Sequence, residues 1–326
     1  DHASGEEVES GRLRTTPAAL EKFFATRASA RIVMEVGTHS PWVSRIAASS
    51  CAETFVANAR ELRFIFKSTR KSDGVDARML ARVGRMDPEL LSPIRHRGEE
   101  AQRDLVLIRA RHALVTARTK LVNSVRGLIK SSGSRLPKQA AKSIGHRTRD
   151  RVPEALRETF APMLLTIEFL TDEITTYDRK VDHLATKRYP ETAVLTQVTG
   201  VGNLTALAYV LTLEDPRHYA TSRDVGAFLG LVPKRDQSGE IDKQLRISKT
   251  GDSLLRTLLV QCAHYILGRN GPDTDLKRHG ERIASRGGKI AKRKAVIAVA
   301  RKLAVLLHAL WRTGEVYDPN RTNCAA

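Results

Sequence analysis

The feature that most restricts the fold of this chain is an apolar repeat over residues 163–184. Large apolar side chains recur there in alternating steps of four and three residues, at Met163, Ile167, Leu170, Ile174, Tyr177, Val181 and Leu184. An average period of 3.5 residues is typical of a coiled-coil helix, which buries such a seam against a second helix. Because proline inside a helix removes a backbone hydrogen bond, we expect this helix to start at Pro162.

Two partners for this seam are open. One is a second long helix in the same chain, predicted for residues 100–130 from apolar residues at helical spacing and ended by Ser131-Ser-Gly-Ser134. Packing of these two helices would give an antiparallel hairpin. The other partner is the same helix of a second protomer, which would make the seam an oligomer contact.

The first third of the chain alternates helices and strands. Its predicted elements are, in order, one half of a hairpin at residues 6–15 after a turn at residues 2–5, a helix from Pro17, a buried strand at residues 31–36, a second strand at residues 53–57, a basic stretch and a helix from about Asp73. Such alternation predicts an α/β layer architecture.

The chain beyond residue 191 is predicted to be mainly helical, with loops at Asp215-Pro216 and at residues 233–240. Apolar residues at helical spacing predict two late helices, over residues 254–266 and 296–310. The second is preceded by three consecutive basic residues, Lys292, Arg293 and Lys294, which are candidates for nucleic-acid binding.

The charge balance points to a polyanionic partner. Lys and Arg number 55 against 36 acidic residues, which gives a net charge of +19, and the excess is spread along the whole chain. Such a surface favours nucleic acid, because neutralising phosphates releases condensed counterions. Membrane is the competing partner, but the most apolar stretch, residues 294–311, is interrupted by Arg301 and Lys302. We therefore expect no membrane association.

The three cysteines are too far apart in sequence to suggest a zinc site or a disulfide framework. No signal peptide is visible, so a cytoplasmic, nucleoid-associated protein is expected. Aromatic residues make up only 5% of the chain, so stacking on unpaired bases is not expected to be the main mode of binding.

Three acidic residues are candidates for a metal site. Glu35 ends the first predicted strand, where open α/β sheets place ligands, and an ionised carboxylate beside an apolar run is costly unless it is paired. Asp73 and Asp76 are three residues apart at a predicted helix start and share one face. Carboxylate oxygens suit Mg²⁺. Alternatively, Asp73 caps the helix, Asp76 stabilises its first turn and Glu35 pairs with an arginine.

A Gly-x-Gly turn at Gly200 and Gly202 lies between two helical stretches. Backbone N–H groups at a helix N-terminus can bind phosphate, as in a helix-hairpin-helix grip on DNA. No strand precedes the turn, which excludes a dinucleotide-binding motif. A tight interhelical turn without a ligand is the other reading, and both are open.

The polar segment 233–240 holds Ser238 between a glutamine and a glycine, and three basic residues around it could attract a phosphodiester: Lys234, Arg235 and Arg246. No histidine lies nearby in sequence, so this serine would need a metal, a carboxylate or a cation for activation. Most loop serines have no chemical role. The following residues 247–251, which include Lys249, lead into a capped helix on which Arg256 is expected to face the same pocket or a phosphate.

In order and spacing, these motifs resemble those of the insertion sequence 110 (IS110) family of transposases, DEDD-type recombinases related to the pilin-gene invertase. The N-terminal likeness consists of Glu35 after a strand and of residues 71–81, Lys-Ser-Asp-Gly-Val-Asp-Ala-Arg-Met-Leu-Ala. The C-terminal likeness runs from Leu195 through the glycine turn, residues 228–233, Gln237-Ser238-Gly239, residues 247–251 and Leu255-Arg256.

The resemblance implies a DNA transposase and site-specific recombinase. It implies a RuvC-like (RNase H-like) α/β domain at residues 1–130, a helical coiled-coil connector at 131–190 and a mainly helical transposase domain at 191–326. An Asp-Glu-Asp-Asp tetrad would bind Mg²⁺, with Glu35, Asp73 and Asp76 in its second, third and fourth places. Ser238 would be the nucleophile and form a transient phosphoserine link. The family works as dimers or tetramers guided by a structured bridge RNA, with carboxylates and serine from different subunits.

The sequence departs from the family pattern at one place. The first aspartate of the tetrad belongs on a strand that would precede residue 1. We therefore expect the natural protein to start further upstream, and a chain that begins at Asp1 to lack the first strands and one metal ligand, and to be inactive.

Two rival functions are compatible with the residues alone. One is a metal-dependent RuvC-like nuclease that hydrolyses DNA with water and uses no serine. The other is a non-catalytic basic nucleic-acid-binding protein built on a coiled coil, for which the charge of +19 would suffice.

Overall fold

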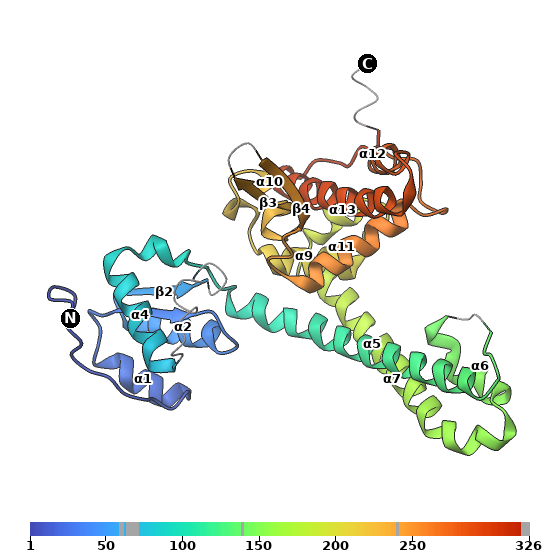
Figure 1. Ribbon diagram of the computed structural model, residues 1–326, viewed down its shortest axis with the longest axis horizontal. Helices are drawn as coiled ribbons and strands as arrows, with labels where there is room; N and C mark the ends of the chain where they lie inside the picture. Colours follow the sequence, from blue (N-terminus) through green and yellow to red (C-terminus); the bar gives the residue numbers. More distant parts are fainter. Residues whose placement is uncertain (59–61, 63–71, 138–139, 239–240, 321–326) are drawn as a thin grey trace. The chain divides into compact units, whose positions relative to one another are not determined.

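The computed structural model describes residues 1–58, 62, 72–137, 140–238 and 241–320 (Figure 1). They divide into two compact units, residues 1–99 and 100–326. In the part of the chain that is described, no helix is both long and apolar enough to cross a membrane.

The first unit is a small α/β structure. Its elements are α1 (Pro17–Ala25), β1 (Arg31–Glu35), α2 (Ser40–Ser50), β2 (Glu53–Ala57), α4 (Asp73–Met86) and the 3-10 helix η1 (Pro88–Leu91). Strands β1 and β2 are parallel, in a register that pairs Arg31 with Glu53 and Glu35 with Ala57. The predicted strands and the helices at Pro17 and Asp73 are therefore confirmed.

Alternation along β1 accounts for the layers of this unit. Successive side chains of a strand point to opposite faces. Ile32 and Met34 accordingly pack with residues of α1 and α2, among them Phe24. Val33 lies on the other face and packs with Leu80 of α4. The small sheet is thus covered by helices on both faces.

Two expectations for the first unit are wrong. Residues 6–15 form no strand; they contain only two large apolar side chains, Val8 and Leu13, and both are exposed, so a strand there has no face to bury. This segment is instead tied down by ion pairs of Glu7 with Arg78 and of Glu9 with Arg27. The strand predicted to be buried is half-buried over residues 31–34, and Glu35 is exposed.

The second unit begins with a hairpin of two long helices, α5 (Glu99–Ser131) and α7 (Arg157–Lys187), joined through α6 (Ile144–Thr148) and short 3-10 turns (Figure 1). The helices are antiparallel, because Arg111 of α5 bonds to Asp178 of α7 at 2.5 Å and Arg118 to Thr171 at 3.3 Å. Nearer the tip, the following residues of α5, α7 and their connection form one apolar cluster: Val122, Val125, Ile129, Ile144, Val152, Phe160, Leu164 and Ile167.

The structure therefore selects the intramolecular partner for the apolar repeat. Ile167, Leu170, Ile174 and Val181 are buried within a single chain. A supercoil of the two helices stays a prediction. The expected start at Pro162 is wrong, since α7 begins at Arg157 and includes the proline. Burial of Phe160 in the apolar cluster stabilises this extra turn more than the proline destabilises it.

The rest of the second unit is mainly helical, as predicted. Its elements are α8 (Thr192–Thr196), α9 (Asn203–Leu213), η5 (Pro216–His218), α10 (Ser222–Phe228), β3 (Pro233–Ser238), β4 (Ile241–Ile247), α11 (Ser253–Ile266), α12 (Asp275–Ala284) and α13 (Gly288–Thr313). Helix α9 is the centre of the core: all its residues from Thr205 to Leu213 are buried, and the Tyr209 hydroxyl donates to the Ala304 carbonyl of α13 at 2.6 Å.

The loop predicted for residues 233–240 is also wrong. Residues 233–238 form strand β3, which pairs with β4 in an antiparallel hairpin. Strand β3 is polar after Pro233 and has no apolar alternation, so periodicity gives no signal there. Strand β4 places Ile241, Leu245 and Ile247 at alternate positions, but Lys243 interrupts the pattern. The useful signal was the connection, because only Gly239 and Glu240 separate the strands and a glycine-containing pair is typical of a tight hairpin.

Ile174→Asp should destabilise the chain without changing its mass in solution. The substitution places a carboxylate at a site that is 4% exposed and should lower the free energy of unfolding by about 3 to 5 kcal/mol. Thr176→Asp, on the exposed face of α7, is the control and should shift stability by at most about 0.5 kcal/mol. Urea unfolding and light scattering measure the two quantities. A lower oligomer mass for Ile174→Asp alone would show that the seam is a subunit contact.

Candidate functional site

The three predicted metal ligands lie at the ends of two neighbouring elements of the first unit. Glu35 is the last residue of β1, and Asp73 and Asp76 occupy the first turn of α4. The helix is capped by Ser72, whose hydroxyl accepts a hydrogen bond from the Val75 N–H at 3.3 Å. The alternative in which Asp73 is the cap is therefore wrong. Both aspartates still favour the first turn, because negative charge complements the helix dipole there.

Helix α4 packs on β1 through its last turn. The Arg31 guanidinium donates to the Gly84 carbonyl at 2.8 Å, and a methyl group at Gly84 would lie 2.4 Å from a methyl of Val33. Contact therefore involves the first residues of β1 and the end of α4. Glu35 and the two aspartates lie at the other end of each element.

In the described part of the chain, no side-chain partner explains the three carboxylates structurally. Among the described residues, none forms a hydrogen bond or ion pair with the side chain of Glu35, Asp73 or Asp76, so the expected alternative pairing of Glu35 with an arginine is not observed. One oxygen of Asp76 is buried and has no hydrogen-bond partner in this part of the chain. A buried, unpaired carboxylate oxygen is costly, and a cation would satisfy it.

These residues do not form a complete metal centre by themselves. Within the described ranges, no three histidine, cysteine, aspartate or glutamate side chains are placed to hold one ion. The lysine that opens the predicted 71–81 motif lies outside the described residues. The donor chemistry thus fits a hard cation at Asp76, and the convergence of all three carboxylates stays a prediction.

The Gly-x-Gly turn forms as predicted, between α8 and α9. Gly200 has a φ of +96°, and a methyl group there would lie 2.9 Å from the Tyr265 ring, so both backbone conformation and packing require glycine. Gly202 precedes α9 and is exposed. The Asn203 amide beside it donates to Asp182 of α7 at 2.9 Å. These contacts support the reading as an interhelical turn, and phosphate binding by the turn stays a prediction.

Ser238 is the last residue of β3, at the tip of the hairpin, where it pairs with Ile241. Its side chain and the connecting residues 239–240 lie outside the described residues. The predicted basic neighbours Lys234, Arg235 and Arg246 are exposed on the two strands. The hairpin therefore carries the serine and positive charge on one projecting element.

The base of this hairpin is held by a close approach of two backbone segments, residues 228–232 and 248–251. The Ser248 N–H donates to the Val232 carbonyl at 2.9 Å, and the Lys249 N–H donates to the Gly230 carbonyl at 3.1 Å. A methyl group on Gly251, whose φ is +69°, would lie 2.0 Å from the Phe228 carbonyl oxygen. The approach is possible only without a side chain at this position.

Arg256 of α11 fastens the same two segments. Its guanidinium donates to the carbonyls of Leu229 at 2.9 Å and Thr250 at 2.6 Å. Asp252 caps α11 by accepting from the Leu255 N–H at 2.9 Å, and it also pairs with Arg109 of α5 at 3.3 Å. Sequence reasoning missed this role for Arg256, because its partners are backbone groups that no side-chain pattern reveals.

The remaining predicted binding residues lie on exposed surface. Lys249 is exposed and has a φ of +56°, and Lys292, Arg293 and Lys294 are exposed in the first turns of α13. The opposite face of α13 is buried and includes Ala295, Val299 and Leu303. These basic residues are therefore available to a ligand, and binding by them stays a prediction.

Two family profiles match the chain. Residues 2–132 match the DEDD transposase domain of IS110 elements, described as "Transposase", and residues 192–279 match the profile "Transposase IS116/IS110/IS902 family". The first contains the carboxylates and the second contains the glycine turn, the serine hairpin and Arg256. The chain belongs to the IS110 family of transposases.

Individual relatives agree with the family. The transposase for insertion sequence element IS1328 of Yersinia enterocolitica is 29% identical over 264 residues, which span 79% of this chain and 77% of the relative. The transposase for IS1111A of Coxiella burnetii is 28% identical over 265 residues, or 77% of this chain and 70% of the relative. The chain is accordingly an insertion-sequence transposase with a DEDD-type domain, a class that uses divalent metal.

Gly251→Ala should disrupt the base of the hairpin in this IS110 transposase. The added methyl group meets a backbone oxygen that cannot move aside, so we expect a loss of about 2 to 5 kcal/mol in the free energy of unfolding. Gly314→Ala is a matched control, because Gly314 also has a positive φ, +68°, but no atom lies within 4 Å of the added group. Backbone strain alone should lower its stability by about 1 kcal/mol. Equal losses in urea unfolding would contradict the close approach.

Proposed function

We propose that this transposase cuts and joins DNA through Ser238 as nucleophile, with Mg²⁺ bound by Glu35, Asp73 and Asp76. The observation that carries the proposal is the position of Ser238 at the tip of a hairpin whose base is fixed. A nucleophile must be held close to the productive geometry, and a strand anchored to the core achieves this better than a free loop. The exposed cations of the hairpin favour a phosphodiester beside it.

The proposed step transfers the phosphorus of a DNA phosphodiester to the serine oxygen. The Ser238 hydroxyl loses its proton and its oxygen attacks the phosphorus of a DNA phosphodiester. The P–O bond to the deoxyribose oxygen breaks, and the departing oxygen takes up a proton. The phosphoserine link formed in this way is then attacked by a hydroxyl of another DNA end, which restores the serine and joins the strands.

The acidic residues of the first unit have a separate role. A divalent ion there would offset the phosphate charge and stabilise the attacking or leaving oxygen. The buried, unpartnered oxygen of Asp76 supports its assignment as a ligand, because a hard cation is the partner it lacks among the described residues. Glu35 and Asp73 are assigned from the family motif. Their positions also agree with it, since Glu35 is at the C-terminal end of β1 and Asp73 at the N-terminal end of α4.

The partners proposed are donor and target DNA, a structured bridge RNA and further copies of the chain. The net charge of +19 supports polyanionic partners. The nucleic-acid backbone is proposed to contact the following residues: Gly200, Gly202, Lys249, Arg256 and the basic residues in the first turns of α13. For Arg256 such a contact would add to its bonds with two carbonyl groups.

Ser238→Ala should abolish strand cleavage and leave DNA binding intact. The variant removes only the proposed nucleophilic oxygen, so labelled element-end DNA should no longer become covalently attached to the full-length protein in the presence of magnesium and its RNA. Ser285→Ala, an exposed serine after α12, is the control and should react normally. Cleavage that survives in Ser238→Ala would favour a nuclease that uses water.

Asp76→Asn should remove recombination and metal binding together. The amide keeps the size of the side chain but is a poor ligand for Mg²⁺. Magnesium should raise the melting temperature of the wild-type protein and have no such effect on the variant, because a ligand that binds only the folded state stabilises it. Glu21→Gln, an exposed residue of α1, is the control. Tighter DNA binding with full recombination in Asp76→Asn would favour a purely architectural role for the carboxylate.

A further inference from the structure

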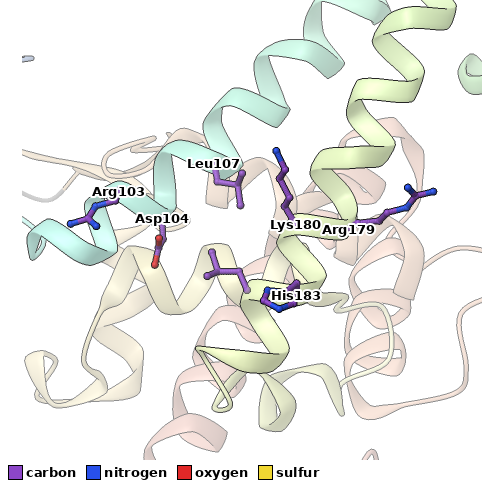
Figure 2. A pocket seen from close by; sticks show the side chains of 7 residues that line it. Arg103, Asp104, Leu107, Arg179, Lys180 and His183 are labelled. Atoms are coloured by element: carbon purple, nitrogen blue, oxygen red, sulfur yellow. The ribbon is translucent and has the colours of Figure 1, made fainter.

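A basic cavity lies between α5 and α7 of the second unit. It measures about 440 Å³ and is lined by Arg103, Asp104, Leu107, Arg179, Lys180, His183 and Leu184. Figure 2 shows Leu107 of α5 and Lys180 and His183 of α7 around the space between the helices, with Arg103 and Arg179 extending outward at its two edges. The α7 side of the cavity falls outside both regions that match the family profiles.

The single carboxylate of the cavity is already bonded to other side chains of the protein. Asp104 is 8% exposed and accepts a hydrogen bond from the Tyr189 hydroxyl at 2.6 Å. Arg188 approaches the same carboxylate at 3.3 Å. Burial and this hydrogen bond raise the pKa of Tyr189, so the hydroxyl remains a donor. Asp104 is therefore buried and held by these partners.

Two cations of the cavity, Arg179 and Lys180, lie on α7. Among the described residues, neither Arg179, Lys180 nor His183 forms an ion pair, although acidic residues lie nearby on α7. Asp178 is bonded to Arg111, and Asp182 accepts from Asn203. Lys180 lies over the Tyr177 ring, 5.3 Å from its centre, a contact that leaves its charge in place.

We infer that this cavity binds the sugar-phosphate backbone of a nucleic-acid strand. Cations at the edges meet phosphate oxygens, while Leu107 and Leu184 form an apolar wall suited to the sugar face. The inference rests on the proposed function for the identity of the ligand as a nucleic acid of the transposition reaction. A second copy packed through the same surface fits less well, because Arg103, Arg179 and Lys180 of the two cavities would face like charges.

The test is a binding measurement on the full chain with Arg179→Gln/Lys180→Gln. Lys120→Gln/Lys130→Gln removes the same charge from exposed positions elsewhere on α5 and is the control. The probes are a fluorescent 30-base-pair DNA duplex and a fluorescent RNA hairpin of the same length, each titrated at several salt concentrations. Each lost phosphate contact should lower the slope of log K against log salt by about 1, so the cavity variant should lose about 1 to 2 units and bind at least tenfold more weakly.

The outcomes separate this inference from the proposed function. A loss confined to the duplex or to the RNA supports the cavity and identifies its ligand as DNA or RNA, respectively. Equal affinities and slopes for the cavity and control variants would overturn the cavity while leaving serine chemistry untouched. A lower oligomer mass for the cavity variant without nucleic acid would assign the surface to a second copy and also overturn it. If the cavity variant binds nucleic acid more weakly as predicted, but Ser238 of the wild-type protein never becomes covalently attached to DNA, only the proposed function is overturned.

Discussion

The serine hairpin depends on one constraint, the contact between two stretches of backbone at its base. Residues 228–232 and 248–251 come so close that the Gly251 α-carbon faces the Phe228 carbonyl with no room for a side chain. Backbone carbonyls in such a contact need donors, since a buried unpaired carbonyl is costly. Arg256 supplies them to Leu229 and Thr250 from the first turns of α11. Gly251 thus permits the close approach of the two segments, and Arg256 donates hydrogen bonds to two of their carbonyl groups.

The same contact transmits the rigidity of the core to the hairpin. Leu229 and Leu231 flank Gly230 on one segment, and Leu255 precedes Arg256 on α11. All three leucines are buried in the core cluster that surrounds α9. Strand β3 has little apolar surface of its own to bury, and a two-stranded hairpin alone is marginally stable in water. Its orientation must therefore come from the base, which explains why glycines and an arginine far from the serine occur within the same family motif.

Sequence patterns predicted local structure well and long-range contacts poorly. The apolar run of β1 and the spacing in α5 and α7 each mark one element, and those elements are where they were expected. The choice between α5 and a second protomer as the partner of α7 depends on which surfaces meet, and periodicity is the same in both cases. Likewise, Arg109 and Asp252 are 143 residues apart, so no local pattern connects them. The hairpin was missed because β3 has no apolar alternation and because Lys243 interrupts the alternation of Ile241, Leu245 and Ile247 in β4.

The two aspartates at the start of α4 differ in how far local structure explains them. Negative charge in the first turn of α4 is favourable for both aspartates, and for the exposed Asp73 that is a sufficient explanation. It does not explain why one oxygen of Asp76 is buried without a donor among the described residues. An unsatisfied buried polar atom destabilises a protein by about 1 to 3 kcal/mol, and such local conflicts are expected where function requires them. Binding a cation at Asp76 would remove that conflict, so the step that assembles the acidic site would also stabilise the start of α4.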